Sequence, residues 1–357
     1  MNDILKPELI WIEGRCYRVN DPTVDISIHQ EHDLYENETP YQDLQDDEDD
    51  EDYEVEMVDS SRYCTRFHVA KHYLGHIIGK KGATRMRIQR DTKTDIKIPK
   101  LGENNDVVIY GPSISSVKAA RRRINVIVLS ARMKNQSTHF ISIPMNNSII
   151  VKNFEIFKES VLRECPSKGL EESLFIKSSK LHITVGVMCL MDNEERLLAS
   201  KLLTEAKEHV IMPIIQNYLP LKMRLKGLSY MNDDPKNIHV LYACVEEDDA
   251  PPGLLQNMVD AIVEFFYKKG LMDKEFGRDN VKIHVTLLNS KYRGGSSELI
   301  EDDNPKKRTK ESFDGSEILR KFNDYDFGVM QLENIHLSQR KSMGPDGFYQ
   351  QTCVISL

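Results

Sequence analysis

Two copies of a short motif carry the residue types for acid–base chemistry on a phosphate. His182-Ile183-Thr184 and His284-Val285-Thr286 each place a histidine two residues before a threonine. On a β-strand, residues two apart face the same side, so each copy presents an imidazole beside a hydroxyl. Because the unperturbed pKa of imidazole is about 6.5, one ring can be neutral and the other protonated at neutral pH. The pattern predicts a cleft between two imidazoles that holds a phosphate.

In such a cleft one histidine would activate a water and the other would protonate the leaving oxygen. Thr184 and Thr286 would bind the non-bridging phosphate oxygens through hydrogen bonds, and neither a metal nor another cofactor would be required. The sequence leaves open which histidine is the base.

The elements around the two motifs repeat along the chain. Each unit is predicted to form a strand, a helix and a second strand that carries the motif. The first unit runs from Thr138 through Ser148 to the strand from Lys180, and the second from Ile238 through Pro252 to the strand from Val281. If the two units pack about a pseudo-twofold axis, the four motif side chains converge on one cleft.

This pair of motifs resembles the two-histidine phosphoesterase superfamily, in which an apolar residue follows the threonine, as Val185 and Leu287 do here. The resemblance extends from Ser137 to the C-terminus. It implies a duplicated, two-lobed fold that acts on 2′,3′-cyclic phosphates or RNA ends, with four catalytic residues: His182, Thr184, His284 and Thr286.

Further side chains near the motifs are candidates for substrate contact. Three tyrosines are candidates for stacking on a base, although at least two are expected in the core: Tyr230, Tyr242 and Tyr292. Arg340 would neutralise a phosphate, or else be exposed on an edge strand. Three other histidines lack a threonine two residues on and are predicted to be structural: His139, His239 and His336.

A basic segment precedes this region. Residues 62–134 hold seventeen Lys or Arg against four acidic residues, and their pattern predicts the order β-α-α-β-β-α. Gly79-Lys80-Lys81-Gly82 lies between the first two helices, where glycines let backbone amides approach a phosphate closely. The segment resembles the eukaryotic K-homology domain. It implies a clamp for single-stranded RNA, with DNA as the alternative, that includes Gly79, Lys80, Lys81, Gly82, Arg85 and Arg87.

The chain is therefore predicted to be α+β and to have four parts, which are residues 1–18, 19–61, 62–134 and 137–357. Residues 1–18 contain the only tryptophan and are predicted to be a partner-docking motif, unless they pack back on the body. Residues 19–61 hold seventeen acidic residues and no Lys or Arg, which predicts a disordered linker. That linker is either a spacer or an acidic competitor for the RNA site.

Composition narrows the class of protein. No apolar run approaches the roughly 20 residues that span a bilayer, and no signal peptide is evident. The six cysteines are scattered, which favours a reducing compartment and argues against a zinc site or a disulfide framework. The basic run Lys306–Lys310 is either a nuclear localisation signal or a solvated loop. The first interpretation agrees with the nuclear location that the resemblance described next implies, with the cytoplasm as the alternative.

The two domains together with four short strings resemble one family of subunits. The strings are LKPELIWIEGRCYRVN, YMNDDP, ESFDG and IHLSQR. The resemblance implies a nuclear subunit of a helicase-containing complex for transcription coactivation and repair of alkylated nucleic acid. The expected function is an RNA-binding protein whose metal-independent cleft acts on or senses RNA ends. The alternative is a non-catalytic RNA- or nucleotide-binding adaptor of that complex.

Overall fold

The computed structural model describes residues 9–12, 15–18, 53–59, 61–99, 106–272, 280–295 and 311–357. It divides into two compact units, Met1–Tyr53 and Glu54–Leu357. In the first unit, β1 (Leu9–Ile12) pairs antiparallel with β2 (Arg15–Arg18). Most of the predicted acidic linker, residues 19–52, and the basic run Lys306–Lys310 lie outside the described residues.

The basic segment has the element order that the sequence predicts. The order is β4 (Arg62–Phe67), α1 (Lys71–Ile78), α2 (Ala83–Thr92), β5 (Asp95–Lys97), β6 (Val107–Gly111) and α3 (Ile114–Lys134). Tyr73, Ile77, Ile109 and Ile124 are fully buried between its helices and its sheet. Ser113 caps α3, because its hydroxyl accepts the backbone N–H of Ser116.

The predicted boundary of the acidic linker was wrong at its C-terminal end. Strand β3 (Glu56–Asp59) pairs antiparallel with β4 and gives the sheet the order β3-β4-β6-β5. Strand β4 has two edges and β6 occupies one, so its other edge offers backbone partners that composition alone does not reveal. Glu56 and Met57 take that place, opposite Cys64 and Tyr63.

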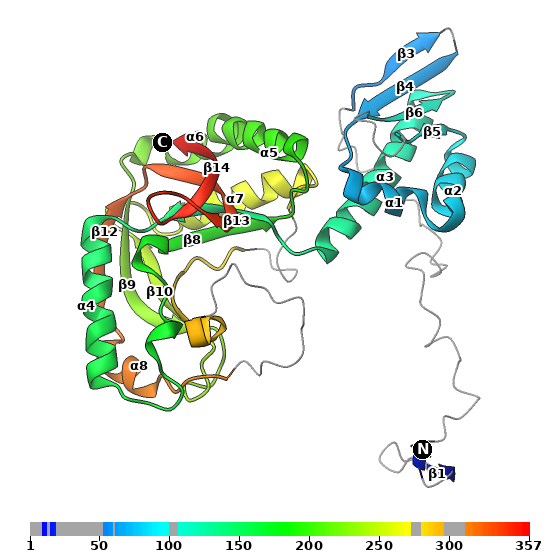
Figure 1. The fold of residues 1–357 in the computed structure, drawn as a ribbon. Helices are drawn as coiled ribbons and strands as arrows, with labels where there is room; N and C mark the ends of the chain where they lie inside the picture. Colours follow the sequence, from blue (N-terminus) through cyan, green and yellow to red (C-terminus); the bar gives the residue numbers. More distant parts are fainter. Residues whose placement is uncertain are drawn as a thin grey trace, which may run out of the picture. The chain divides into compact units, whose positions relative to one another are not determined.

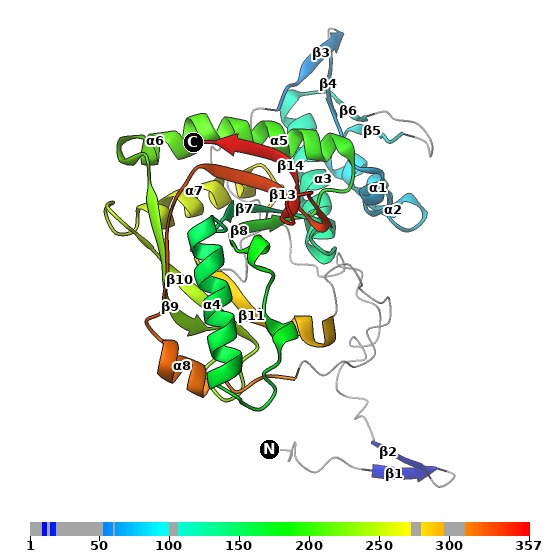
Figure 2. The ribbon, with the colours of Figure 1, turned by 60° about the vertical axis from the view of Figure 1, so that its left-hand side comes forward.

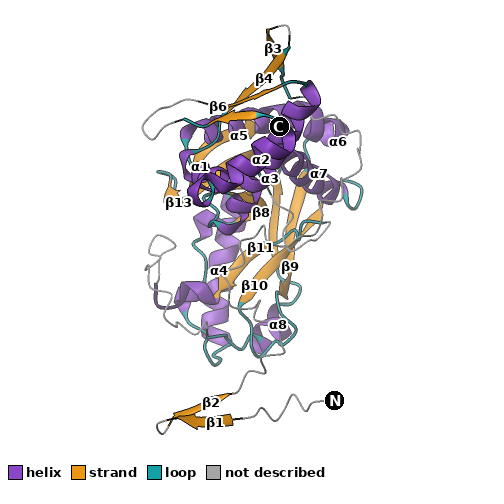
Figure 3. Ribbon diagram, turned by 90° about the vertical axis from the view of Figure 1, so that its right-hand side faces the viewer, coloured by secondary structure: helices purple, strands orange, loops and turns teal. Residues whose placement is uncertain are grey.

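The described part of residues 137–357 is built around one curled sheet of eight strands in the order β12-β9-β10-β11-β8-β7-β13-β14 (Figure 1). The strands are β7 (His139–Pro144), β8 (His182–Met188), β9 (Lys222–Tyr230), β10 (Val240–Glu247), β11 (Val285–Asn289), β12 (Asp326–Gln331), β13 (Asn334–Met343) and β14 (Tyr349–Ser356). Figure 3 shows β9, β10 and β11 running together, as their pairing requires.

Helices pack against this sheet. They are α4 (Ser148–Glu164), α5 (Asn193–Ala206), α6 (Met212–Ile215), α7 (Leu254–Lys268) and α8 (Ser316–Phe322). Helix α4 packs on β12, α7 on β8, and α5 along β14, as Figure 2 shows for the last pair. None of the helices in the described ranges is long and apolar enough to cross a membrane.

Apolar spacing explains why these helices form and which face they bury. Ile150, Phe154, Phe157 and Val161 recur every three or four residues of α4 and are fully buried. They join the same hydrophobic cluster as the inward-facing residues of the central strands. The cluster therefore fixes one face of the sheet and leaves the opposite face of β8 and β11 for the motif side chains.

A buried ion pair joins the end of α3 to the start of α5. The Arg132 guanidinium donates to Glu195 Oε1 at 2.7 Å and to the Cys189 carbonyl at 2.6 Å, and both charged side chains are less than a tenth exposed. Glu195 Oε2 in turn accepts the Met191 N–H at 2.7 Å. Tyr73 of α1 completes the contact, since its ring lies 5.3 Å from the guanidinium. Helix α3 of the basic segment is thus bonded directly to the larger sheet domain.

Candidate active site and nucleic-acid interface

The two His-x-Thr motifs lie on neighbouring antiparallel strands at the centre of the sheet. Ile183 of β8 pairs with Val285 of β11, and both side chains are fully buried in the core. Extending this register by one residue on each side places His182 across from Thr286 and Thr184 across from His284. All four side chains are half-buried on the face opposite the core. Each imidazole therefore sits beside its own threonine and opposite the threonine of the other motif.

Both imidazoles are oriented by the same backbone bond. His182 Nδ1 lies 2.7 Å from the Lys180 carbonyl oxygen, and His284 Nδ1 lies 2.7 Å from the Lys282 carbonyl oxygen. A carbonyl only accepts, so Nδ1 carries the hydrogen in each ring. In the neutral rings Nε2 is consequently the basic nitrogen, and His182 Nε2 lies 3.1 Å from Thr184 Oγ1.

The match between the two motifs extends beyond the histidine and the threonine. Lys180 and Lys282 each precede a motif histidine by two residues, and each ammonium lies 4.9 Å from the centroid of a tyrosine ring. Tyr349 is the ring under Lys180 and lies 5.3 Å from the His182 ring. Tyr242 is the ring under Lys282 and lies 5.2 Å from the His284 ring. The sequence therefore repeats a longer motif, Lys-x-His-x-Thr.

The surroundings of His182 are more aromatic than those of His284. Phe140 and Phe348 also contact the His182 ring, with centroids at 5.2 and 6.2 Å. Together with Tyr349 they form a small buried cluster outside the main core. Sequence reasoning missed all three, because they come from β7 and the β13–β14 hairpin and carry no motif.

The other candidate residues are partly or fully packed into the domain. Tyr230 and Tyr292 are half-buried and pack against the main core, and Tyr242 is buried beside His284. Arg340 lies on β13, which is an interior strand, and its Nη1 donates to Ser137 Oγ at 2.9 Å. The expectation of an exposed arginine on an edge strand was therefore wrong. Contact of Tyr230, Tyr292 or Arg340 with substrate stays a prediction.

Two of the histidines that were predicted to be structural are buried and held neutral. Burial lowers the pKa of His139 to about 4 and also lowers the pKa of His336. The third, His239, has its Nδ1 3.2 Å from Ser290 Oγ. None of these three belongs to either His-x-Thr motif.

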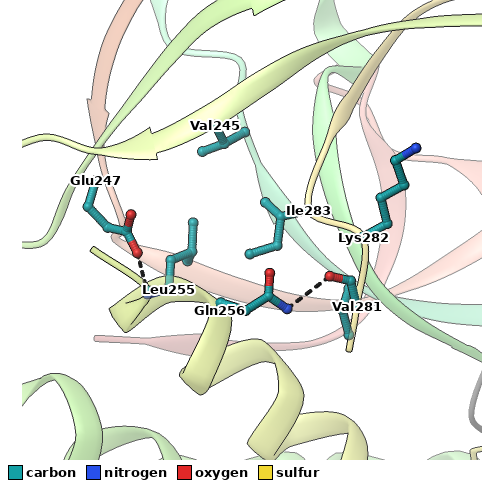
Figure 4. Close-up of a pocket in the computed structure, with 8 residues that line it drawn as sticks. Val245, Glu247, Leu255, Gln256, Val281, Lys282 and Ile283 are labelled. Carbon is teal, nitrogen blue, oxygen red and sulfur yellow. Dashed lines mark hydrogen bonds between the residues drawn. The ribbon is translucent and has the colours of Figure 1, made fainter. Parts of the chain in front are cut away.

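A cavity of about 410 Å³ opens near the second motif, between β10, the start of α7 and residues 281–283 (Figure 4). Its polar groups bond to the backbone around it, since Glu247 accepts the Leu255 N–H and Gln256 donates to the Val281 carbonyl. Figure 4 shows the Lys282 side chain extending away from Ile283 and Leu255. The cavity therefore adjoins the second motif, and two of its polar side chains already bond to the backbone.

The Gly79-Lys80-Lys81-Gly82 segment forms a tight turn between α1 and α2. Gly79 and Gly82 have φ angles of +69° and +82°, and a Cβ at Gly79 would overlap the Thr84 side chain. Lys80 and Lys81 between them are exposed.

Arg85 and Arg87 of α2 are half-buried, so they are less accessible than the two lysines of the turn. The turn presents backbone and two cations at the N-terminus of α2, which is the arrangement that binds a phosphate chain.

Comparisons with known proteins agree with this architecture. Residues 137–357 match the AKAP7 2'5' RNA ligase-like domain, and residues 64–126 match the KH domain. The chain is 34% identical over 355 residues to mouse (Mus musculus) activating signal cointegrator 1 complex subunit 1, with 97% of each chain covered. This chain belongs to the family of that subunit.

Membership confirms two predictions from the sequence. The fold is an α+β arrangement of a K-homology domain followed by a ligase-like phosphoesterase domain, and the subunit family is the one that the short strings indicated. The interpretation of the second domain as a duplicated, two-lobed unit stays a prediction.

Proposed function

We propose that this protein binds single-stranded RNA and hydrolyses a phosphodiester, in the first instance a 2′,3′-cyclic phosphate at an RNA end. The observation that supports this most strongly is the crossed arrangement of the two motifs. Each imidazole faces the other motif's threonine, and each is oriented by an Nδ1–H bond to the carbonyl two residues earlier.

The chemistry follows from that symmetry. A neutral imidazole takes a proton from water at Nε2 while the water oxygen attacks phosphorus. The bond from phosphorus to one ribose oxygen breaks, and the second, protonated imidazole donates its Nε2 proton to that oxygen. Thr184 and Thr286 donate hydrogen bonds to the non-bridging oxygens, whose charge grows in the transition state. The products are a phosphate monoester and a free hydroxyl, without a metal ion.

In this proposal the K-homology domain binds the RNA strand. Its glycine turn and exposed Lys80 and Lys81 support binding of a single-stranded backbone, and the buried Arg132–Glu195 pair ties this domain to the one that carries the cleft. RNA is favoured because a 2′,3′-cyclic phosphate requires a ribose 2′-oxygen. Single-stranded DNA is the alternative ligand of the K-homology domain.

We also propose that the protein works in a complex. The mouse relative is by name a subunit of the activating signal cointegrator 1 complex, and the resemblance implies a helicase partner, a nuclear location and a role in transcription coactivation and repair of alkylated nucleic acid. Affinity purification of the tagged full chain, with and without residues 1–18, tests the partner and the docking motif together. Loss of nuclear accumulation when Lys306, Lys307, Arg308 and Lys310 are replaced by Gln tests the location.

The catalytic proposal is tested by hydrolysis of a short RNA that ends in a 2′,3′-cyclic phosphate, with EDTA present. The natural chain should turn over, and His182→Ala and His284→Ala should each abolish turnover. His239→Ala is the matched control, since its Nδ1 contacts Ser290 and not a motif residue. Tight RNA binding without any hydrolysis would overturn the catalytic proposal for this substrate and favour the non-catalytic adaptor.

A further inference from the structure

The repeated lysine of Lys-x-His-x-Thr has no part in the acid–base chemistry described above. Its carbonyl orients the histidine, but that role needs only backbone and would be served by any residue. The side chain is nevertheless the same in both copies, and so is its setting over a tyrosine ring. A duplicated side-chain arrangement of this kind calls for an explanation beyond the backbone bond.

The tyrosines hold the two ammonium groups at defined places. Tyr349 and Tyr242 are 3% and 6% exposed, so neither ring is available to stack on a base. Each ring instead contacts both a motif imidazole and a lysine ammonium. A cation held over an aromatic ring keeps its charge and loses little freedom when it binds an anion.

The antiparallel register puts the two lysines at opposite ends of the row formed by His182, Thr184, His284 and Thr286. The central pair Ile183 and Val285 is flanked first by the crossed His and Thr residues. Because strands β8 and β11 run in opposite directions, Lys180 lies beyond His182 at one end of the row and Lys282 lies beyond His284 at the other. The row therefore reads cation, first imidazole, second imidazole, cation. A phosphate between the imidazoles has one ammonium on each side of it.

We infer that Lys180 and Lys282 bind the phosphates that flank the reacting phosphate, and that the substrate is an oligonucleotide strand lying along β8 and β11. This inference rests on the proposed function and adds to it the side chains that distinguish a strand from a nucleoside cyclic phosphate. A nucleoside cyclic phosphate carries a single phosphate and cannot engage a flanking cation. A strand carries one phosphate per nucleotide and engages Lys180 or Lys282, or both when the reacting phosphate is internal.

The test compares two substrates with the same reacting group. One is a nucleoside 2′,3′-cyclic phosphate, and the other is a decanucleotide with that nucleotide at its 3′ end. Lys180→Gln and Lys282→Gln keep the backbone carbonyls that orient His182 and His284. The matched control is Lys269→Gln, whose ammonium also lies over a ring, that of Phe265 at 5.7 Å, but over a ring that contacts no motif histidine.

At least one of the two lysine variants should raise KM for the decanucleotide about three- to tenfold, with kcat nearly unchanged. Neither should alter the kinetics of the nucleoside cyclic phosphate, and Lys269→Gln should alter neither substrate. Equal losses on both substrates, or no loss on the decanucleotide in either variant, would overturn the inference while leaving the hydrolase itself intact.

A binding measurement separates this inference from the catalytic proposal. Lys80→Asp and Lys81→Asp weaken RNA binding by the K-homology turn. In the full chain that carries both, the remaining binding of the decanucleotide therefore measures binding at the cleft. The slope of log Kd against log salt should fall by about 0.7 for each flanking lysine that is lost. That change is expected even if no substrate is turned over, and an unchanged slope in the Lys180→Gln, Lys282→Gln double variant would refute the flanking contacts.

Discussion

Replacing Arg132 by methionine should destabilise the protein strongly, because Arg132 is a buried cation with two buried acceptors. Its guanidinium bonds to Glu195 Oε1 and to the Cys189 carbonyl, and its side chain is 8% exposed. Methionine fills much of the same volume but leaves the Glu195 carboxylate buried without its counter-charge. Breaking one side of a buried pair costs about 3 to 5 kcal/mol, and we expect a loss of that size in the free energy of unfolding.

A second substitution separates the charge effect from simple loss of packing. Glu195→Gln added to Arg132→Met removes the stranded charge while Oε1 of the glutamine can still accept the Met191 N–H, so it should recover about 2 kcal/mol. Urea unfolding followed by far-ultraviolet circular dichroism measures both variants. A loss below about 1 kcal/mol in Arg132→Met, or no recovery in the double variant, would contradict the reasoning.

Two further predictions concern pH and RNA. The pKa of His139 is lowered to about 4 in the folded protein, from about 6.5 in the unfolded chain, so the unfolded chain binds a proton first as pH falls. The free energy of unfolding should therefore decrease between these two pH values, by up to about 3 kcal/mol. Urea unfolding at pH 7.5 and 4.5 measures this decrease, which should be smaller in His139→Gln than in the natural chain. Lys80→Asp together with Lys81→Asp should weaken single-stranded RNA binding at least tenfold without lowering Tm. Gly79→Ala should lower Tm, because the φ angle of Gly79 is +69° and Thr84 leaves no room for a Cβ. Equal effects of the two changes on Tm would contradict the assignment of RNA binding to the lysines and of the turn conformation to Gly79.

The sequence could predict the K-homology elements because local pattern and turn chemistry agree there. The strands and helices of residues 62–134 have their apolar residues at the expected spacing, and Gly79 and Gly82 mark the turn. Strand β3 could not be predicted from its own composition. Its pairing depends on the free edge of β4, which is a property of the folded sheet.

The candidate site was predictable only in part. The paired His-x-Thr motifs identify the side chains, but their crossed arrangement depends on Ile183 pairing with Val285, a contact between residues about a hundred positions apart. Phe140 and Tyr349 approach His182 from two other strands and carry no local signal. The strand β11 is also shorter than the predicted run from Val281, because residues 281–284 precede the first paired residue.

The measurement that tests the central claim most directly is hydrolysis of the RNA 2′,3′-cyclic phosphate by the natural chain, His182→Ala and His284→Ala in EDTA. The crossed two-histidine geometry predicts turnover by the natural chain with a bell-shaped dependence on pH, and its loss in both variants. Turnover that survives either substitution would contradict that mechanism, as would its absence from the natural chain.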